Sequence, residues 1–466
     1  MPLKFYNTME RRLVEFQPLV EGQVSMYCCG PTVYNYAHIG NLRTYIFEDV
    51  LRRTFETLGY QVKHVMNVTD VGHLTGDGDE GEDKMLQGAR ERGRTVWEIA
   101  RFFSDAFFED ATKLAIERPN VVCPATEHID DMIALIKKLE SKGLTYQAGG
   151  NVYFDTSKFP EYGRLALLDR QETSVARTSY DSNKRNLRDF VLWFTRSKFD
   201  GQAMVWDSPW GRGYPGWHIE CSAMSMKYLG ESFDLHCGGI DHIPVHHTNE
   251  IAQSEGATGK PWVKYWLHGE FLLLSKEKMS KSTGDFLTLQ KLIEKGYDPL
   301  DYRWFCLGAH YRSPLTFSWE ALEGARNSRR NLLDKVREWK RAGEPLPLSE
   351  AGKAYLAQWH EALENDLAMP QALSVLWAVV KDTTMAPGEK LALALALDQV
   401  LGLGLAQLSA PVEEAVPSEV QTLVQERLSA RKAKDWAESD RLRQEIKNLG
   451  WLVEDTPQGP VVKRAV

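Results

Sequence analysis

Strand-like apolar runs and segments with helical spacing alternate along the chain from its N-terminus. Val24 to Cys29 has the pattern of a short buried strand that Gly30-Pro31 closes. A second apolar run, Val62 to Val68, predicts another strand. Between them, apolar residues at steps of three and four predict a helix that ends at Gly59: Leu42, Ile46, Val50, Leu51, Phe55 and Leu58. We therefore expect a strand-helix-strand unit of the doubly wound kind over residues 24–68, with a ligand site at its first strand-helix turn.

The pattern changes near residue 120. An amphipathic helix is predicted from Ile129 to Gly143, and the Gly149-Gly150 turn joins two strand-like runs. Residues 120–200 therefore have the character of an insertion.

Strand patterning resumes near Phe233 and again from Tyr265 to Leu274. From Trp319 onward the pattern predicts helices separated by short Pro/Gly/Glu linkers. The linkers at 343–350 and 410–419 are candidate domain boundaries.

Composition places the chain among globular proteins. It has 466 residues, of which 43% are apolar, and 56 basic against 64 acidic residues give a net charge of −8. This length fits about three domains. The most apolar stretch, Leu391 to Leu408, is interrupted by Asp398 and Gln399, so it predicts a core helix and no membrane span.

The N-terminal sequence has no apolar run of signal-peptide type, so we expect a cytoplasmic protein with reduced thiols. Its 6 cysteines are too scattered for a disulfide framework and indicate metal binding or catalysis.

Two basic clusters stand out in this acidic protein: Arg326 to Arg341 and Arg427 to Lys434. Each is typical of a solvated helix face. Because both clusters follow a predicted nucleotide-binding fold, they are candidates for contacts with nucleic-acid phosphates. Trp436 and Trp451 are candidates for stacking on bases or for the core of a small domain.

The tetrapeptide His38-Ile39-Gly40-Asn41 lies at the predicted start of the first helix, where backbone N–H groups favour an anion such as a triphosphate. His38 and Asn41 can donate hydrogen bonds to phosphate oxygens, and Gly40 permits close approach of a nucleotide. On its own, the tetrapeptide is more simply explained as an ordinary helix cap.

A second motif, Lys278-Met279-Ser280-Lys281-Ser282, changes that interpretation. Lys278 and Lys281 lie three residues apart in a Ser/Gly-rich segment and can neutralise a pyrophosphate leaving group. Together the two motifs resemble the HIGH and KMSKS signature sequences of class I aminoacyl-tRNA synthetases.

Four further residues have the side chains of a zinc site: Cys29, Cys221, His246 and Glu250. His246 and Glu250 are four residues apart on a predicted helix, so both side chains leave the same face and can share one ion. Taken singly, such a cysteine is usually a core residue, and a helical His/Glu pair usually lies on the surface.

The sequence around these residues resembles the cysteinyl-tRNA synthetase family over nearly the whole chain. The likeness is carried by MYCCGPTVY, GWHIECSAM, GGIDH followed by HHTNEIAQSE, KMSKSTG and the C-terminal RLSARKAKDWAESDRLR. It implies an α/β fold: a doubly wound Rossmann-type catalytic domain with an inserted connective region, then a C-terminal helical bundle and a small anticodon-binding domain.

The resemblance also implies the metal and the partners. The family's zinc cysteine directly precedes the glycine of the segment MYCCGPTVY, which is Gly30 here, and this implies Cys29 in preference to Cys28. One zinc ion per chain would be held by the four residues named above. The substrates would be L-cysteine, ATP with Mg²⁺ and tRNA(Cys), with no membrane partner, and we expect a monomer.

Other roles follow from the resemblance in the same way. Thr69 and Trp217 would border the amino-acid pocket, and Gly239 and Asp241 would face the adenosine ribose. The remaining contacts with ATP or the transition state would come from the two motifs: His38, Gly40, Asn41, Lys278 and Lys281.

The implied domains follow in chain order: the first half of the Rossmann domain with the HIGN motif at 1–119, the connective insertion at 120–200, the second half with the zinc ligands at 201–270, the KMSKS loop and stem-contact region at 271–325, the helical bundle at 326–409 and the anticodon-binding domain at 410–466. Several features depart from the family, among them residues 242–245 and Thr248 around the zinc helix and Phe194 after Leu192-Trp193. Asn41 replaces the usual second histidine, and the loop at 71–85 is longer and more acidic than usual.

The implied reaction joins cysteine to AMP and then to tRNA. A shape-based pocket separates substrates as similar as cysteine and serine by only about 10- to 200-fold. Zinc prefers a thiolate to a hydroxyl, so a metal site supplies the missing discrimination without an editing domain.

Two alternatives remain open at this stage. A ligase that joins cysteine to an amino-sugar would share the catalytic core, but it has no need of a basic, helical C-terminal region. A non-catalytic RNA-binding paralogue is disfavoured by the intact lysines and the full set of zinc ligands.

Overall fold

The computed structural model describes residues 2–72, 95–168, 181–196, 204–275, 287–409, 416–456 and 459–464. The chain forms two compact units, Met1–Leu408 and Ser409–Val466. This division falls next to the boundary predicted at residue 410, whereas the linker at 343–350 lies inside the first unit. Within the described part of the chain, no helix is both long and apolar enough to cross a membrane.

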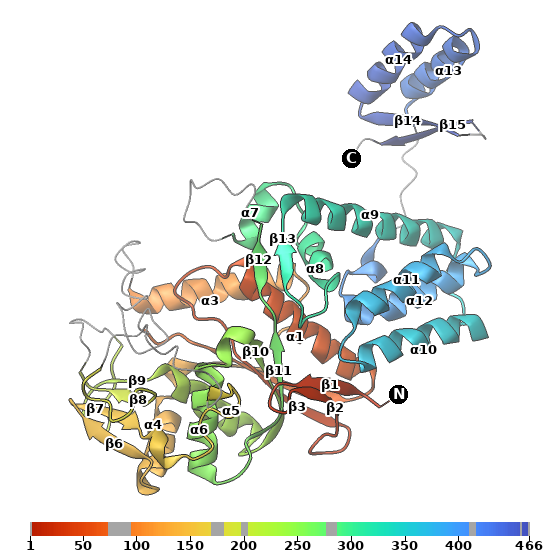
Figure 1. Cartoon of the computed structure of the whole chain (residues 1–466). Helices are drawn as coiled ribbons and strands as arrows, with labels where there is room; N and C mark the ends of the chain where they lie inside the picture. Colours follow the sequence, from red (N-terminus) through yellow and green to blue (C-terminus); the bar gives the residue numbers. More distant parts are fainter. Residues whose placement is uncertain are drawn as a thin grey trace. The chain divides into compact units, whose positions relative to one another are not determined.

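A five-stranded parallel sheet lies at the centre of the first unit (Figure 1), in the order β11-β10-β3-β4-β5. Its strands are β3 Gln23–Cys28, β4 Gln61–Val68, β5 Val121–Pro124, β10 Phe233–Gly239 and β11 Val263–Gly269. The chain passes from β3 to β4 on one side and from β10 to β11 on the other, so the winding reverses between β3 and β10. Doubly wound sheets bind ligands at the carboxyl ends of the strands beside such a reversal.

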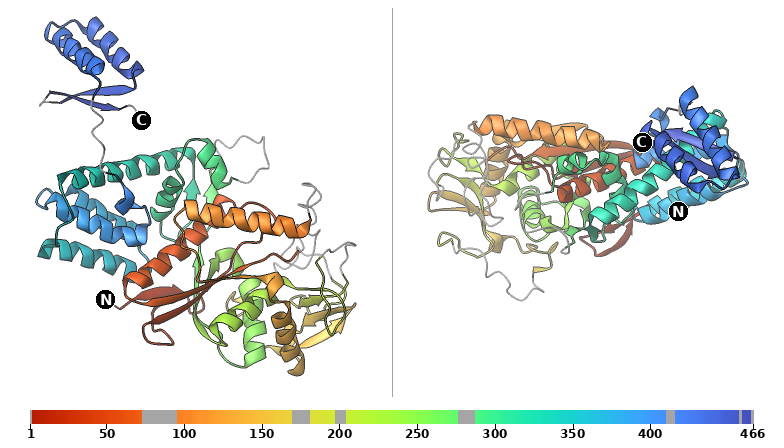
Figure 2. Two further views of the ribbon diagram at one scale, coloured as in Figure 1. Left: turned by 180° about the vertical axis from the view of Figure 1, so that it is seen from behind. Right: turned by 90° about the horizontal axis from the view of Figure 1, so that it is seen from above.

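Helices pack against both faces of this sheet (Figure 1, Figure 2). They are α1 Ile39–Thr57, α3 Val96–Lys113, α5 Trp217–Leu229 and α6 His246–Thr258. Side chains of β3 alternate between the faces: Met26 and Cys28 pack with α1, and Tyr27 packs with α5 and α6. The predicted strand-helix-strand unit is therefore confirmed, with its helix starting inside the first motif.

The segment between β5 and β10 adds an antiparallel sheet in the order β6-β7-β8-β9. Its elements are η1 Ala125–Glu127, α4 Ile129–Ser141, β6 Thr145–Ala148, β7 Asn151–Phe154, η2 Thr156–Lys158, β8 Phe190–Phe194 and β9 Tyr214–Pro215. Gly149 and Gly150 make the predicted turn with φ angles of 58° and 95°, which favour glycine. The sheet takes its last strand from beyond the predicted limit at residue 200, because Tyr214 pairs with Phe194.

The run with strand patterning from Tyr265 to Leu274 contributes to two strands in different sheets. The second of these pairs with a later strand: β12 spans Leu272–Leu274 and β13 spans Leu315–Phe317. Arg43 of α1 lies at the break, and its guanidinium donates to the main-chain oxygens of Glu270 (2.9 Å) and Phe271 (2.6 Å). The strand therefore bends away from the central sheet at this point.

The rest of the first unit is an N-terminal hairpin and a helical region. The hairpin and the helical region comprise β1 Lys4–Asn7, β2 Arg12–Glu15, α7 Leu289–Glu294, α8 Pro299–Leu307, α9 Trp319–Ala342, α10 Glu350–Glu364, α11 Met369–Lys381, α12 Pro387–Leu401 and η5 Leu405–Gln407. A further short helix, η4 Ile240–His242, lies between β10 and α6. The most apolar stretch forms a core helix as predicted, but this helix ends at Leu401. Gly402 adopts a φ angle of 65°, and a left-handed residue ends an α-helix.

The second unit pairs two helices with a hairpin. Its elements are α13 Ser418–Lys432, α14 Trp436–Asn448, β14 Trp451–Thr456 and β15 Gly459–Arg464. The prediction that everything after Trp319 is helical is wrong for the last two elements, which pair as antiparallel strands. Trp451 and Val453 alternate with exposed residues and are buried against the helices. Burial of every second residue is the pattern of a strand, which explains why this segment is not helical.

Candidate active site

A cavity of about 310 Å³ opens at the carboxyl ends of β3, β4 and β10, where the winding of the sheet reverses. Most of the predicted site residues line it: Cys29, His38, Asn41, Thr69, Trp217, Cys221, Gly239, Asp241 and His246. Gly40 and Glu250 are in contact with lining residues, His38 and His246 respectively. Lys278 and Lys281 lie outside the described residues.

The first motif caps its own helix. Nδ1 of His38 accepts the backbone N–H of Asn41 (3.2 Å), and Oδ1 of Asn41 accepts the backbone N–H of His38 (3.3 Å). A Cβ at Gly40 would lie 2.9 Å from Nδ1 of His38, so glycine allows the ring to fold back over the helix. The helix cap considered for this tetrapeptide is therefore present.

The cap also determines which atoms of the motif can donate. Burial lowers the pKa of His38 more than the nearby Asp241 raises it, so the ring is neutral near pH 7. Because Nδ1 accepts a hydrogen bond, the ring proton is on Nε2. The donors that the motif offers are thus Nε2–H of His38 and the Nδ2 amide hydrogens of Asn41.

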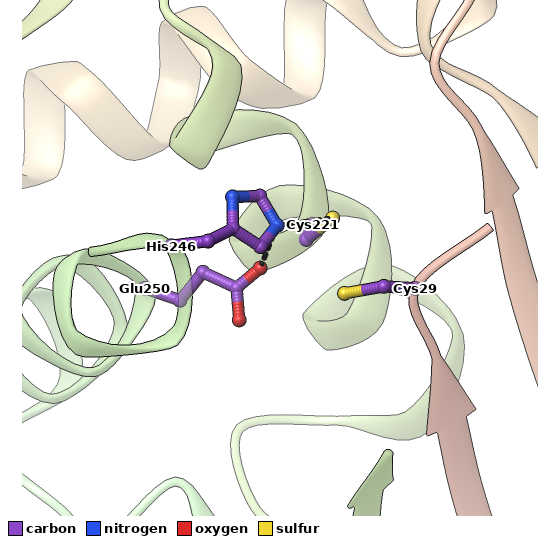
Figure 3. A group of neighbouring side chains, drawn as sticks. All are labelled: Cys29, Cys221, His246 and Glu250. Carbon is purple, nitrogen blue, oxygen red and sulfur yellow. Dashed lines mark hydrogen bonds and ion pairs between the residues drawn. The ribbon is translucent and has the colours of Figure 1, made fainter. Parts of the chain in front are cut away.

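Four potential metal ligands converge beside the cavity (Figure 3). Cys29 directly follows β3, Cys221 lies on α5, and His246 and Glu250 lie one turn apart on α6. One ligand atom from each lies within 4.8 Å of the other three, and all four side chains are buried. Nε2 of His246 is 3.6 Å from Sγ of Cys221 and 2.9 Å from Oε1 of Glu250.

This donor set fits a zinc ion in chemistry and in geometry. Oε1 of Glu250 is buried and accepts no well-aligned hydrogen bond, although Nε2 of His246 is close. Nε2 of His246 and Oε1 of Glu250 are expected to lie this close without an aligned hydrogen bond if the lone pairs of both atoms point at a shared ion. The other carboxylate oxygen accepts from Nε2 of His236 (2.8 Å), a partner of the kind that orients a ligating group.

Burial and hydrogen bonding shift the pKa values of the set in different directions. Burial raises the pKa of the Cys29 thiol well above its usual value. For Cys221, hydrogen bonds from Cys29 and His246 outweigh burial and lower the pKa. The pKa of Glu250 is also lowered, because the charges of His246 and His236 outweigh its burial. The pKa values of the two thiols are therefore shifted in opposite directions, because burial dominates at Cys29 and hydrogen bonds dominate at Cys221.

A second possible ligand set shares two residues with the first: Cys29, His236, His247 and Glu250. Nε2 of His247 lies 3.3 Å from Sγ of Cys29, and Nδ1 of His247 lies 2.8 Å from Nε2 of His268. His236 and His247 are not among the metal ligands predicted from the sequence. Three members of the first set line the cavity, whereas Cys29 alone does so in the second, so the first set can present an ion to a bound ligand.

The two residues predicted to border the amino-acid pocket lie in the same cavity as the metal ligands. The ring of Trp217 packs on the imidazole of His246, with centroids 4.4 Å apart. Thr69 follows the end of β4, and its hydroxyl donates to Oε2 of Glu220 (3.0 Å). Glycines let the main chain approach closely here: a Cβ at Gly30 would collide with the main-chain oxygen of Asn67.

Gly239 and Asp241 lie where β10 ends. The winding of the sheet reverses between β10 and β3, the strand that precedes α1. A Cβ at Gly239 would collide with Oδ1 of Asp241, so glycine is needed for the carboxylate to fold back over the strand end. This places an acceptor for hydroxyl groups in the cavity wall.

The residues on either side of the second motif are held beside the first. The backbone N–H of Ile39 donates to the main-chain oxygen of Leu287 (2.8 Å), and His38 forms a bridge with Thr288. Before the motif, Arg43 holds the oxygens that precede β12. Both flanks of residues 276–286 are thus fixed to the N-terminal part of α1.

Comparison with known families gives matches to both units. Residues 15–327 match the model described as the tRNA synthetases class I (C) catalytic domain. Residues 413–460 match the model of the cysteinyl-tRNA ligase anticodon binding domain.

Individual proteins resemble the chain over nearly its whole length. The cysteine-tRNA ligase of Treponema denticola is 52% identical, and the match covers 98% of this chain and 98% of the relative. Cysteine-tRNA ligase 1 of Burkholderia lata is 49% identical over 98% of this chain and 96% of the relative. A solved methionyl-tRNA synthetase of Mycobacterium tuberculosis, bound by methionyl-adenylate, matches with a TM-score of 0.58 at 16% identity, over 82% of this chain and 93% of that one, which shows the fold alone.

Proposed function

The chain belongs to the cysteine-tRNA ligase family of class I aminoacyl-tRNA synthetases, and on this premise we propose that it activates L-cysteine with ATP and transfers it to tRNA(Cys). The observation that carries the proposal is the convergence of Cys29, Cys221, His246 and Glu250 at the cavity. A site that presents a thiophilic ion to a small cavity distinguishes a thiol from a hydroxyl, which is the difference between cysteine and serine.

These four residues would hold one zinc ion. When bound, zinc supplies a positive charge that favours a thiolate ligand over a hydroxyl. The chain itself contributes rigidity: His246 and Glu250 share one helix face, and His236 fixes the carboxylate from behind. Trp217, packed on His246, would border the space next to the ion.

In the first step, a carboxylate oxygen of cysteine would bond to the α-phosphorus of ATP, and the bond to the β-phosphate oxygen would break. Nε2–H of His38 and the amide of Asn41 would donate to phosphate oxygens at the N-terminus of α1, where the helix dipole favours anions. Lys278 and Lys281 would neutralise the departing pyrophosphate together with the Mg²⁺ that accompanies ATP.

The nucleoside would lie across the place between β3 and β10 where the winding of the sheet reverses. Asp241 and the main chain at Gly239 would contact the ribose, while Gly40 would let the nucleotide approach α1. Little proton transfer by the protein is needed, so catalysis would come from positioning and from charge stabilisation.

In the second step, a hydroxyl of the terminal ribose of tRNA would attack the carbonyl carbon of cysteinyl-adenylate, and AMP would leave. The match of residues 413–460 to an anticodon-binding model supports a tRNA acceptor over an amino-sugar. We also expect the enzyme to act as a monomer in the cytoplasm, where translation consumes charged tRNA.

Pyrophosphate exchange tests the proposed function. Cysteine should support exchange without tRNA, serine should not, and the purified protein should contain one zinc per chain. Cys29→Ser should lose both the zinc and the discrimination against serine, while the matched control Cys28→Ser should keep both. Exchange that fails with cysteine would reject the enzyme activity. Exchange without charging of tRNA(Cys) would favour the amino-sugar ligase.

A further inference from the structure

An exposed aromatic ring lines the active-site cavity. Tyr36 is 45% exposed and belongs to the segment that joins β3 to α1. Its Cα lies no more than about 7.6 Å from that of His38, because only two trans peptide units separate the two residues. The backbone N–H of Tyr36 donates to Oδ1 of Asn35 (2.9 Å). The ring is therefore held close to the motif that we propose to bind the phosphates of ATP.

Two phenylalanines of α3 pack against this ring. The centroids of Tyr36 and Phe103 are 5.0 Å apart at an interplanar angle of 87°, and those of Tyr36 and Phe102 are 6.0 Å apart at 74°. Phe103 is buried and also lines the cavity. Nearly perpendicular contacts of this kind are a favourable geometry for aromatic pairs. Neither phenylalanine takes the parallel, stacked position on the tyrosine ring, and the exposure of Tyr36 leaves the side chain accessible.

The aromatic group of Tyr36, Phe102 and Phe103 lies on one particular side of the cavity. Phe103 packs in one cluster with Val68, the last residue of β4. Gly239 and Asp241, which we propose to contact the ribose of ATP, lie at the end of β10. The strand order is β10-β3-β4, so the aromatic group and the ribose contacts are on opposite sides of β3.

The transfer step would bring a second nucleoside into this cavity. A hydroxyl of the terminal ribose of tRNA would have to reach the carbonyl carbon of the adenylate while the AMP part is still bound. The base of that nucleotide then needs a place that AMP does not occupy. Unpaired bases of RNA stack on aromatic side chains, because every base has a flat face. The aromatic group offers such a surface on the β4 side of the cavity.

We propose that Tyr36 stacks on the unpaired adenine at the 3′ end of tRNA and so positions the terminal ribose for attack on the adenylate. The inference rests on the proposed function and adds to it a residue of the first unit that receives the acceptor end. Phe102 and Phe103 hold the tyrosine ring in place through their perpendicular contacts.

A tRNA(Cys) whose terminal nucleotide lacks its base tests this contact, because it keeps the reacting ribose and removes the stacking partner. The kcat/KM for charging is measured with the full-length, zinc-loaded enzyme. Tyr36→Leu should lower it by about 5-fold or more for normal tRNA(Cys), the loss of one base-aromatic stack. For the tRNA without the base, the same variant should lower it by less than about two-fold. Tyr36→Phe keeps the ring face and should stay within about two-fold of the wild type for both.

A fluorescent base reports the stacking without catalysis. The fluorescence of 2-aminopurine, placed at the 3′ end of tRNA(Cys), is quenched when the base stacks. The wild type and Tyr36→Phe should quench it on binding, and Tyr36→Leu should not. The matched control is Trp97→Leu. Trp97 is also an aromatic residue of α3, is 49% exposed and packs on Trp206 at 6.2 Å, but it does not line the cavity. Its replacement should leave the quenching and the charging of both tRNAs at the wild-type level.

Two results would overturn the proposal. Equal losses with both tRNAs in Tyr36→Leu would assign the ring to the fold. A raised KM for ATP in cysteine-dependent pyrophosphate exchange by the same variant would assign the ring to the adenine of ATP. Failure of the proposed function is distinguishable from both, because the wild-type enzyme would then show no cysteine-dependent exchange at all.

Discussion

Asp49 of α1 and Arg303 of α8 form an ion pair in which Oδ2 and Nη2 are 2.7 Å apart and neither side chain is exposed. Arg303 also donates to the main-chain oxygen of Leu401 at the end of α12 (2.6 Å). Because α1 begins in the active-site cavity, this buried pair ties the helix that carries His38 and Asn41 to the helical region. The charge of Arg303 lowers the pKa of Asp49 in spite of its burial.

We predict that Asp49→Ala lowers the free energy of unfolding by about 3 to 5 kcal/mol, because it leaves a buried guanidinium without a counter-charge. Urea unfolding followed by tryptophan fluorescence measures the change. The matched control is Glu338→Ala, which removes one partner of an exposed pair with Lys335 and should cost less than about 1 kcal/mol. Equal effects of the buried and exposed substitutions would contradict the assignment.

His64 makes stability depend on pH. It is buried on β4, neither ring nitrogen has a hydrogen-bond partner, and burial with the nearby Arg52 lowers its pKa to about 3. The unfolded chain takes up the proton near pH 6.5, whereas the folded protein resists it until about pH 3. The contribution to stability is therefore complete above pH 6.5 and is lost progressively as the pH falls below that value.

We expect His64→Leu to be less sensitive to acid than the wild type. Between about pH 7 and pH 5 the free energy of unfolding of the wild type should fall by about 2 kcal/mol more than that of the variant, since each unit below about pH 6.5 is worth about 1.4 kcal/mol. Urea unfolding at the two pH values measures the difference. Parallel losses in both proteins would show that His64 is protonated in the folded state.

The metal can be assigned to one of the two ligand sets by a pair of neighbouring histidines. His246 belongs to the set that lines the cavity, and His247 belongs to the alternative set with His236. His246→Ala should lower the bound zinc to well below one ion per chain, while His247→Ala should keep one, both measured by elemental analysis after dialysis against a weak chelator. The reverse pattern would move the ion to the second set, away from the cavity.

Much of this site can be predicted from the sequence because its signals are local. Cys29 directly follows a strand that leads toward the first motif, and His246 and Glu250 have the spacing of one helix face. His236 and His247 gave no comparable signal. Their partners, Glu250 and His268, are brought to them by the packing of α6 and β11, which no periodicity in the sequence encodes.

The same limit explains the errors elsewhere. The sequence makes Arg427 a candidate for phosphate contacts, yet it is buried and both terminal nitrogens of its guanidinium bind Asp455 at 2.9 Å. Arg329 of the other basic cluster is likewise buried against Asp301 (2.8 Å). A run of basic residues in the sequence indicates positive charge, but the tertiary fold determines which of these side chains face the solvent.

Asn41 allows capping and catalysis to be separated. Asn41→Asp keeps the oxygen that accepts the backbone N–H of His38 and places a negative charge in the first turn of α1, so stability should be unchanged or slightly higher. The same substitution removes the amide donor and repels the triphosphate. We expect the rate of cysteine-dependent exchange to fall by about 100-fold or more, the loss seen when one donor to a developing charge is removed. Full activity of the Asn41→Asp variant would show that the side chain only caps the helix.

The last prediction concerns the second unit, which we expect to select tRNA and to take no part in adenylate formation. Its core is formed by its own residues, including Trp451, and the first unit holds the whole cavity. A protein ending at Ala410 should therefore catalyse exchange at the wild-type rate and charge tRNA(Cys) poorly.

Within the full-length chain, Trp436 gives a finer test, because it is 57% exposed at the start of α14 and Arg431 lies over its ring at 5.7 Å. An exposed aromatic ring beside an arginine can stack on an unpaired base, a contact worth about 1 to 3 kcal/mol. Trp436→Ala should raise the KM for tRNA and leave exchange unchanged, and the salt dependence of tRNA affinity should persist because phosphate contacts remain. Undiminished charging of tRNA(Cys) by the protein ending at Ala410 would remove the anticodon role of the second unit.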